Sequence, residues 1–157
     1  MPMTILAVGR IAAPYKDAAN EYEKRLGRYG KAQVVELPDQ REPLALSQAL
    51  IEQMKQKEGA LILAHLKPGD HVIALCIDAA QLTSEAFAQR VKALRLAAKP
   101  LCFVIGGSHG LSQAVLARAD EKLSLSSLTM PHQLARVVLL EQLYRAAKIL
   151  ANERYHK

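Results

Sequence analysis

Short apolar runs alternate with segments of helical periodicity along the whole chain, and this alternation restricts the fold more than any other feature. Short, nearly continuous apolar runs fit buried strands, whereas apolar residues spaced three and four apart fit helices. The predicted strands are residues 4–8, 33–37, 71–77, 101–105 and 122–125. The predicted helices are residues 15–29, 44–57, 83–99, 112–118 and 131–152, and the ambiguous segment 60–66 is interpreted as helix. The pattern predicts an α/β fold with a largely parallel sheet and helices on both faces.

Length and composition favour one globular domain. A chain of 157 residues suits a single unit, so residues 1–157 are interpreted as one domain. Half of the residues are hydrophobic and 23% are charged, which is typical of a chain with a packed core. The longest apolar run, residues 72–77, is far shorter than the roughly 20 residues that span a bilayer. The first four residues lack the basic group that opens a signal peptide, so we expect a cytoplasmic protein with no membrane partner.

The chain is basic and contains few cysteines. It carries 21 Lys and Arg against 15 Asp and Glu, and residues 136–157 supply half of the resulting net charge of +6. A basic terminus is commonly a solvated tail, and the alternative interpretation is a tail that binds the phosphates of RNA. Cys76 and Cys102 lie in apolar runs with no second ligand at metal spacing. We therefore expect buried thiols and no metal site.

Three loops follow predicted strands, and ligands bind beyond the carboxyl ends of strands in an open parallel sheet. They are residues 78–80, the glycine turn 106–110 and the hydroxyl-rich segment 126–131. The glycine turn allows close approach of backbone to a ligand but lacks the Gly-x-Gly-x-x-Gly spacing of dinucleotide sites, so a tight structural turn explains it equally well. His109 in this turn is a candidate general base, although an exposed turn histidine is the favoured interpretation. Segment 126–131 either caps the following helix or holds a small polar ligand.

The last predicted helix is apolar almost all round, so it requires cover on most sides. A second subunit is a plausible cover at this end of a small domain. Glu141, Arg145 and Lys148 nevertheless recur at spacings of four and three on one stripe. Glu141 and Arg145 form a favourable i,i+4 pair, and a solvated stripe with a salt bridge is the simplest interpretation.

Several motifs closely resemble one methyltransferase family. The sequence reads Phe-Val-Ile-Gly-Gly-x-x-Gly-Leu-Ser at residues 103–112 and Leu-Ser-Leu-Ser-x-Leu-Thr-x-Pro-His at residues 123–132. It continues with Arg-Val at 136–137, Glu-Gln-Leu-Tyr-Arg-Ala at 141–146 and Tyr-His-Lys at 155–157. With Ala-Val-Gly at 7–9 and the length, the match spans the whole chain. The chain thus resembles the SPOUT superfamily and, within it, the family of the large-subunit ribosomal RNA methyltransferase H.

The resemblance implies an α/β fold with a C-terminal trefoil knot, a homodimer, and S-adenosylmethionine as methyl donor. It implies N3 of a pseudouridine in 23S ribosomal RNA as acceptor, with the assembled ribosome as the expected substrate. Carried over by position, the cofactor residues are Leu75, Gly107, Ser126, Ser127, Leu128, Thr129, Met130 and Pro131. The catalytic positions are His156, Glu141 and Arg145, and the substrate-binding positions are Arg145, Tyr155, His156 and Lys157.

Two departures from the family pattern concern these sites. Many relatives end in Pro-Tyr-His-Arg, where this chain has Arg154 and Lys157 around the shared pair, and lysine lacks the planar fork of arginine. Relatives often carry glycine where residues 78–80 read Asp-Ala-Ala.

The sequence leaves the general base and one functional alternative open. His156 is a candidate base because imidazole serves in that role at neutral pH, and Glu141 is another, unless it orients Arg145. The alternative function is a non-catalytic RNA- or ribosome-binding factor of the same fold. A nucleotide-dependent oxidoreductase is disfavoured by the missing glycine fingerprint.

Overall fold

Five parallel strands form one sheet in the order β2-β1-β4-β3-β5. The structure is a computed structural model that describes residues 3–157. The strands are β1 (Met3–Val8), β2 (Ala32–Leu37), β3 (His71–Leu75), β4 (Leu101–Ile105) and β5 (Glu121–Leu123). Because all strands run the same way, their carboxyl ends meet at one edge of the sheet.

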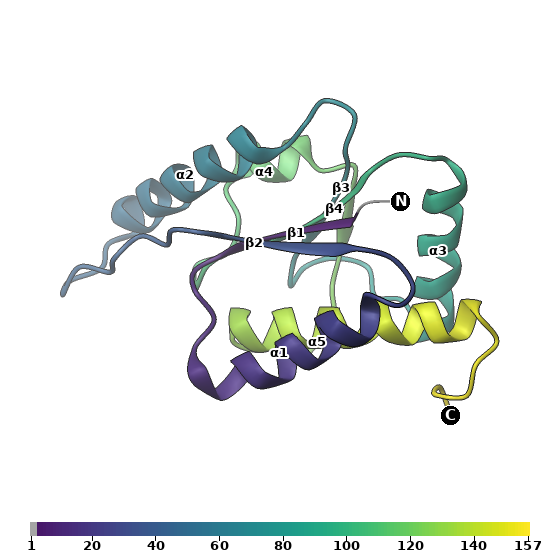
Figure 1. Cartoon of the computed structure of the whole chain (residues 1–157). Coiled ribbons are helices and arrows are strands. Elements are labelled where there is room, and N and C mark those ends of the chain that lie inside the picture. The colour runs from purple at the N-terminus through teal and green to yellow at the C-terminus, as the bar shows by residue number, and fades with distance from the viewer. Residues whose placement is uncertain (1–2) are drawn as a thin grey trace.

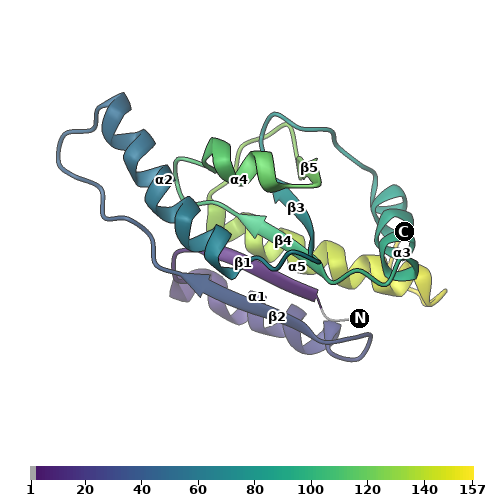
Figure 2. The same cartoon turned by 90° about the horizontal axis from the view of Figure 1, so that it is seen from above.

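Helices cover both faces of this sheet (Figure 1). They are α1 (Ala13–Leu26), α2 (Gln48–His65), α3 (Ser84–Leu96), α4 (Gln113–Arg118) and α5 (His132–Leu150). Helices α1, α3 and α5 pack together on one face, and α2 and α4 lie on the other, as the view from above also shows (Figure 2). The predicted α/β architecture is therefore confirmed, whereas the trefoil knot and the homodimer stay predictions.

Alternate residues of each central strand enter two separate cores. In β4, Leu101, Phe103 and Ile105 pack against α1, α3 and α5, and the two residues between them face α2 and α4. All five are buried. A strand buried on both faces has a continuous apolar sequence. The short apolar runs between the helical segments therefore predict the central strands well.

Several predicted boundaries are wrong. The helices predicted to end at residues 29 and 99 end at Leu26 and Leu96, and the strand predicted to end at residue 125 ends at Leu123. Two further differences have a clear structural cause. β3 ends at Leu75, where its pairing with Leu123 of β5 ends, and Ile77 beyond it is 65% exposed. The second helix begins at Gln48 rather than residue 44, because the Ser47 side chain accepts a hydrogen bond from the Leu50 N–H (3.2 Å) and caps it. The helical interpretation of segment 60–66 is confirmed, since α2 continues to His65.

The cysteines are both free; Cys102 is buried and Cys76 is partly buried. Within residues 3–157, no group of three or more His, Cys, Asp and Glu side chains is arranged to hold a metal ion. No helix in the same part of the chain is both long and apolar enough to cross a membrane.

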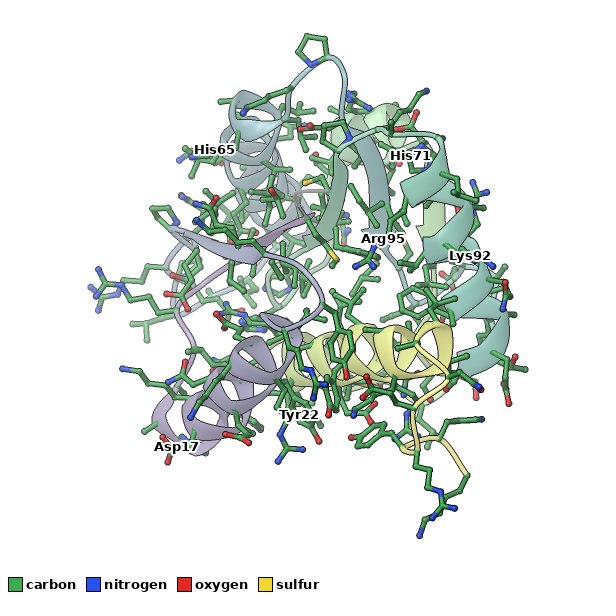
Figure 3. The ribbon with its side chains drawn as sticks, turned by 45° about the vertical axis from the view of Figure 1, so that its right-hand side comes forward. Asp17, Tyr22, His65, His71, Lys92 and Arg95 are labelled. Atoms are coloured by element: carbon green, nitrogen blue, oxygen red, sulfur yellow. The ribbon has the colours of Figure 1, made fainter. Side chains whose placement is uncertain are left out.

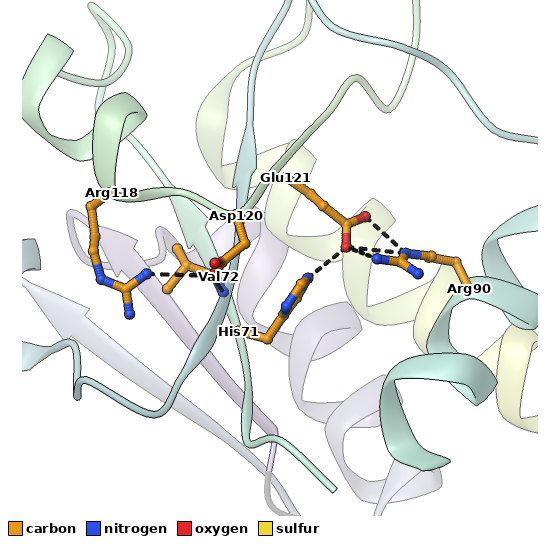
Figure 4. Close-up of polar contacts among 6 residues, drawn as sticks. All are labelled: His71, Val72, Arg90, Arg118, Asp120 and Glu121. Atoms are coloured by element: carbon orange, nitrogen blue, oxygen red, sulfur yellow. Dashed lines mark hydrogen bonds and ion pairs between the residues drawn. The ribbon is translucent and has the colours of Figure 1, made fainter. Parts of the chain in front are cut away.

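Two carboxylates hold the short edge strand β5 beside β3 (Figure 4). Asp120 accepts a hydrogen bond from the Val72 N–H at 2.8 Å, and Glu121 is hydrogen-bonded to the His71 ring at 2.5 Å. Arg90 of α3 donates from Nε to both oxygens of Glu121 at 3.0 Å. The Val72 N–H lowers the pKa of Asp120, and the hydrogen bonds from Arg90 lower that of Glu121.

We predict that Glu121→Gln destabilises the fold at neutral pH by about 1.5–3 kcal/mol, the range for a hydrogen bond to a charged group. The pKa of Glu121 in the folded state lies below its unfolded value, so its contribution is fully present above about pH 5 and disappears as acid protonates the folded carboxylate. Urea unfolding across this pH range measures both effects. Glu21→Gln, which removes an exposed pair with Arg25, is the control and leaves the acid profile unchanged. An unaltered profile in Glu121→Gln would contradict this account.

Candidate active site

A cavity of about 410 Å³ lies at the carboxyl edge of β3, β4 and β5. Its walls are the ends of these strands, the glycine turn 106–110, segment 123–131 and the first turn of α5. The volume falls within the ~300–1,000 Å³ of typical ligand pockets. Two of the three predicted loops therefore meet here. The third, residues 78–80, does not line the cavity, and Cys76 and Ile77 occupy that side instead.

Seven of the eight predicted cofactor residues line this cavity, namely Leu75, Gly107, Ser126, Leu128, Thr129, Met130 and Pro131. The exception is Ser127, which is exposed and does not line it. The Ser126 hydroxyl accepts a hydrogen bond from the Leu128 N–H at 3.0 Å, and the Ser124 hydroxyl donates to the Ser126 carbonyl at 2.9 Å. These two bonds, each between a serine side chain and a backbone group of the same loop, hold the loop in its conformation. Side-chain capping does not explain the hydroxyls, because the N-cap of α5 is Pro131 and no side chain caps it.

The glycine turn is both a tight turn and a wall of the cavity. A Cβ on Gly106 would stand 2.8 Å from the backbone carbon of Gly110, closer than real side chains come. Gly110 itself has φ +86°, the left-handed region that favours glycine. The structural interpretation of this turn is therefore confirmed, and the close approach of a ligand stays a prediction, for which the turn lies in the right place because its glycines border the cavity.

No residue with a permanent charge lines the cavity. None of its lining residues is Lys, Arg, Asp or Glu, and His132 is the one histidine among them. Leu75, Ile77 and Leu123 supply apolar surface, and peptide groups and hydroxyls supply hydrogen bonds. Such a wall suits a ligand with a planar apolar ring and polar edges and offers no ion pair to a phosphate.

His132 is a site residue that the sequence analysis did not single out, although it closes the quoted motif before α5. Burial, and after it the nearby charge of Arg136, hold the pKa of His132 below its usual range, so the ring is neutral at neutral pH. Arg136 follows one turn later and is only 2% exposed. It pairs with Glu36 at 2.5 Å and donates to the Gly9 carbonyl at 2.8 Å.

The predicted catalytic residues lie toward the other end of α5, and none of them lines the cavity. Arg145 is about 20 Å along the helix axis from His132, at 1.5 Å per residue. Glu141 pairs with Arg145 and accepts a hydrogen bond from the Tyr155 hydroxyl at 3.0 Å. The Arg145 guanidinium also stacks 4.7 Å from the centre of the Tyr155 ring.

The tail thus folds back on its own chain. His156 is hydrogen-bonded to Glu85 of α3 at 2.7 Å, and its other ring nitrogen lies 3.4 Å from Arg145. Tyr22 of α1 lies beside α5 (Figure 3), with its ring centre 6.3 Å from that of Tyr144. The structure therefore brings the predicted residues together as two groups, one around the cavity and one at the end of α5.

We predict that Gly106→Ala destabilises the protein by about 1–3 kcal/mol, the usual cost of overpacking, because the added Cβ meets backbone that cannot move aside. The matched control is Gly69→Ala, in an exposed turn where a Cβ meets nothing within 4 Å. Thermal unfolding of the two variants measures the difference. Equal stability of the two variants would show that the turn is not as closely packed as described.

Comparisons with known proteins identify the family and the fold. The family model described as "Predicted SPOUT methyltransferase" matches residues 1–156. Among solved structures, a hypothetical protein is similar with a TM-score of 0.55 and 13% identity, over 95% of this chain and 68% of that one. The A. aeolicus TrmH/SpoU tRNA modifying enzyme has a TM-score of 0.51 and 13% identity, over 95% and 77%. TrmJ from Z. mobilis ZM4 has a TM-score of 0.50 and 14% identity, over 93% and 70%. At these identities the solved structures establish the fold alone.

Proposed function

This chain belongs to the SPOUT methyltransferase family, and from that premise we propose that it methylates N3 of a pseudouridine in 23S ribosomal RNA on the assembled ribosome. The family match confirms the expected cofactor, S-adenosylmethionine. The observation that carries the proposal is the uncharged cavity at the carboxyl edge of the sheet, which seven of the eight expected cofactor residues line.

The cavity fits S-adenosylmethionine by its chemistry. Apolar side chains such as Leu75 and Leu128 suit the faces of an adenine ring, and the peptide groups of the glycine turn suit its polar edge. The absence of Lys and Arg from the wall leaves a sulfonium cation unrepelled and disfavours ligands that carry phosphates. When bound, the cofactor supplies a methyl group already activated for transfer. The protein then has to hold the acceptor base in line and accommodate the proton that N3 loses.

A homodimer is part of this proposal, because one chain keeps its two groups of site residues apart. The polar group at the end of α5 lies about 20 Å from His132 and away from the cavity. A second copy that sets its Arg145, Tyr155 and His156 beside this cavity would complete the site. Arg145 and Lys157 would then contact RNA phosphates, which guanidinium and ammonium groups bind well. Glu141 holds the Arg145 guanidinium in place.

We predict that His156→Ala lowers methyl transfer to ribosomes by about 100-fold or more, the contribution of a general base, while the affinity for S-adenosylmethionine stays unchanged. Tritium transfer from labelled cofactor and calorimetric titration measure the two quantities. His65→Ala is the matched control, since His65 ends α2 and, among the residues that the structure describes, its side chain is hydrogen-bonded to the Leu61 carbonyl alone.

Parallel losses of binding and transfer in His156→Ala would count against a catalytic role for this tail. Cofactor binding by the wild-type protein without transfer to any ribosomal RNA would instead favour the alternative function, a non-catalytic RNA- or ribosome-binding factor.

A further inference from the structure

A second, more polar cavity adjoins the first across the glycine turn. It has a volume of about 230 Å³ and is lined by residues 39–42, by Met54 and Glu58 of α2, by residues 107–109 and by His132. Gly107, Ser108 and His132 line both cavities. The second cavity is smaller than the ~300–1,000 Å³ of pockets for drug-sized ligands, so it suits a small planar group placed next to a larger ligand.

Glu58 is the buried polar side chain of this cavity. The residue is only 7% exposed, and its Oε1 accepts a hydrogen bond from the Gln40 N–H at 3.0 Å. Within residues 3–157, Oε2 has no hydrogen-bond partner. A Cβ on Gly107 would stand 3.0 Å from Oε2, so the carboxyl tip lies against the wall that the two cavities share. Among the described residues, Arg136 Nε is the one fully buried side-chain polar atom without a partner, so Oε2 of Glu58 keeps contact with solvent at the cavity. A ligand that fills the cavity excludes this water, so it has to supply an N–H donor in its place.

The neighbouring groups leave this acceptor available. His109 and Glu42 both line the cavity and pair with each other through the histidine Nε2 at 2.7 Å, so this nitrogen is already used. The prediction that His109 is an exposed turn histidine is wrong, because its side chain is only 23% exposed. Burial raises the pKa of Glu58, and the Gln40 N–H partly offsets this. A donor from a ligand would stabilise the carboxylate further.

This inference rests on the proposed function and names how the target base is selected. The pseudouracil ring carries an N–H at both N1 and N3, whereas uracil joined to ribose through N1 keeps only the N3–H. With N3 directed toward the methyl donor in the first cavity, N1–H is the donor that remains. We propose that the second cavity holds the target base and that Glu58 accepts its N1–H, which selects pseudouridine over uridine.

The energetic reason is the asymmetry of buried hydrogen bonds. A site built around a buried acceptor rejects an analogue that lacks the donor, because the acceptor is then left unpaired and out of water. Uridine has no N1–H, and N1-methylpseudouridine blocks it with a methyl group. Both would leave Oε2 of Glu58 without a partner.

The test uses three nucleotides as probes on the full chain in the presence of S-adenosylmethionine: pseudouridine, N1-methylpseudouridine and uridine 5′-monophosphates. Titrations followed by amide NMR shifts give affinity and place of binding. We expect pseudouridine monophosphate to bind about 10- to 100-fold more tightly than the other two, the range for one hydrogen bond to a charged group. It should shift the amides of Gln40 and Gly107. This comparison needs no variant, so it does not depend on how a substitution folds.

Glu58→Gln gives the second arm of the test. The amide oxygen of the new glutamine still accepts from the Gln40 N–H, so its NH₂ group faces the N1–H of the base. Two donors then face each other, and the preference for pseudouridine monophosphate should vanish. Glu52→Gln on the same helix, at a position paired with Lys55 outside the cavity, should keep the preference. Equal affinities for the three nucleotides, or a pseudouridine nucleotide that leaves the Gln40 and Gly107 amides unmoved, would overturn the proposal.

Failure of this proposal is distinguishable from failure of the proposed function. A wild-type protein that methylates ribosomes yet binds the three nucleotides equally overturns the role of Glu58 alone. A protein that prefers the pseudouridine nucleotide but transfers no methyl group to ribosomes keeps the base site and overturns the methyltransferase activity.

Discussion

Arg136 places a positive charge inside the protein where α5 meets the sheet, and the geometry of the cavity depends on how that charge is neutralised. Its guanidinium pairs with Glu36 at the end of β2 and donates to the carbonyl of Gly9, which follows β1. Burial alone would raise the pKa of Glu36, but the hydrogen bonds from Arg136 and the Ile11 N–H outweigh it and lower that pKa, so the carboxylate stays ionised. Arg136 is the buried member of the pair, whereas the Glu36 side chain is 34% exposed, so removal of Glu36 would leave a buried guanidinium without its charged partner.

The contacts of Arg136 position the start of α5 and, with it, part of the cavity wall. The first turn of the helix carries His132, which borders both cavities, and the preceding segment forms one wall of the larger cavity. The glycine turn forms another wall, and it has no room for a Cβ at Gly106. The shape of the cavity is therefore determined by backbone segments that neighbouring contacts hold in place. The side chains that line it determine which ligand it can bind. Rigid backbone of this kind suits a site that has to position a ligand rather than activate it.

The sequence predicts the parts of this molecule whose role depends on local pattern. β4 is apolar at every position because both of its faces are buried, and loops beyond parallel strands are expected to bind ligands. The same reasoning fails at Ile77. This residue is apolar but exposed, because the short strand β5 stops pairing with β3 before it. In the sequence, Glu58 follows Lys57 in a helical segment and resembles a solvated charge. Its burial depends on Gly107 and Gln40, which approach it from distant parts of the chain. Nor does spacing along α5 reveal that the tail folds back onto Glu85.

We infer, above all, that the uncharged cavity at the carboxyl edge of the sheet holds S-adenosylmethionine. Calorimetric titration of the protein with S-adenosylmethionine, with NADH as the control ligand, tests it most directly. The account predicts micromolar-range binding of S-adenosylmethionine and no heat of binding from NADH. Binding of NADH, or the absence of S-adenosylmethionine binding both with and without ribosomal RNA, would contradict it.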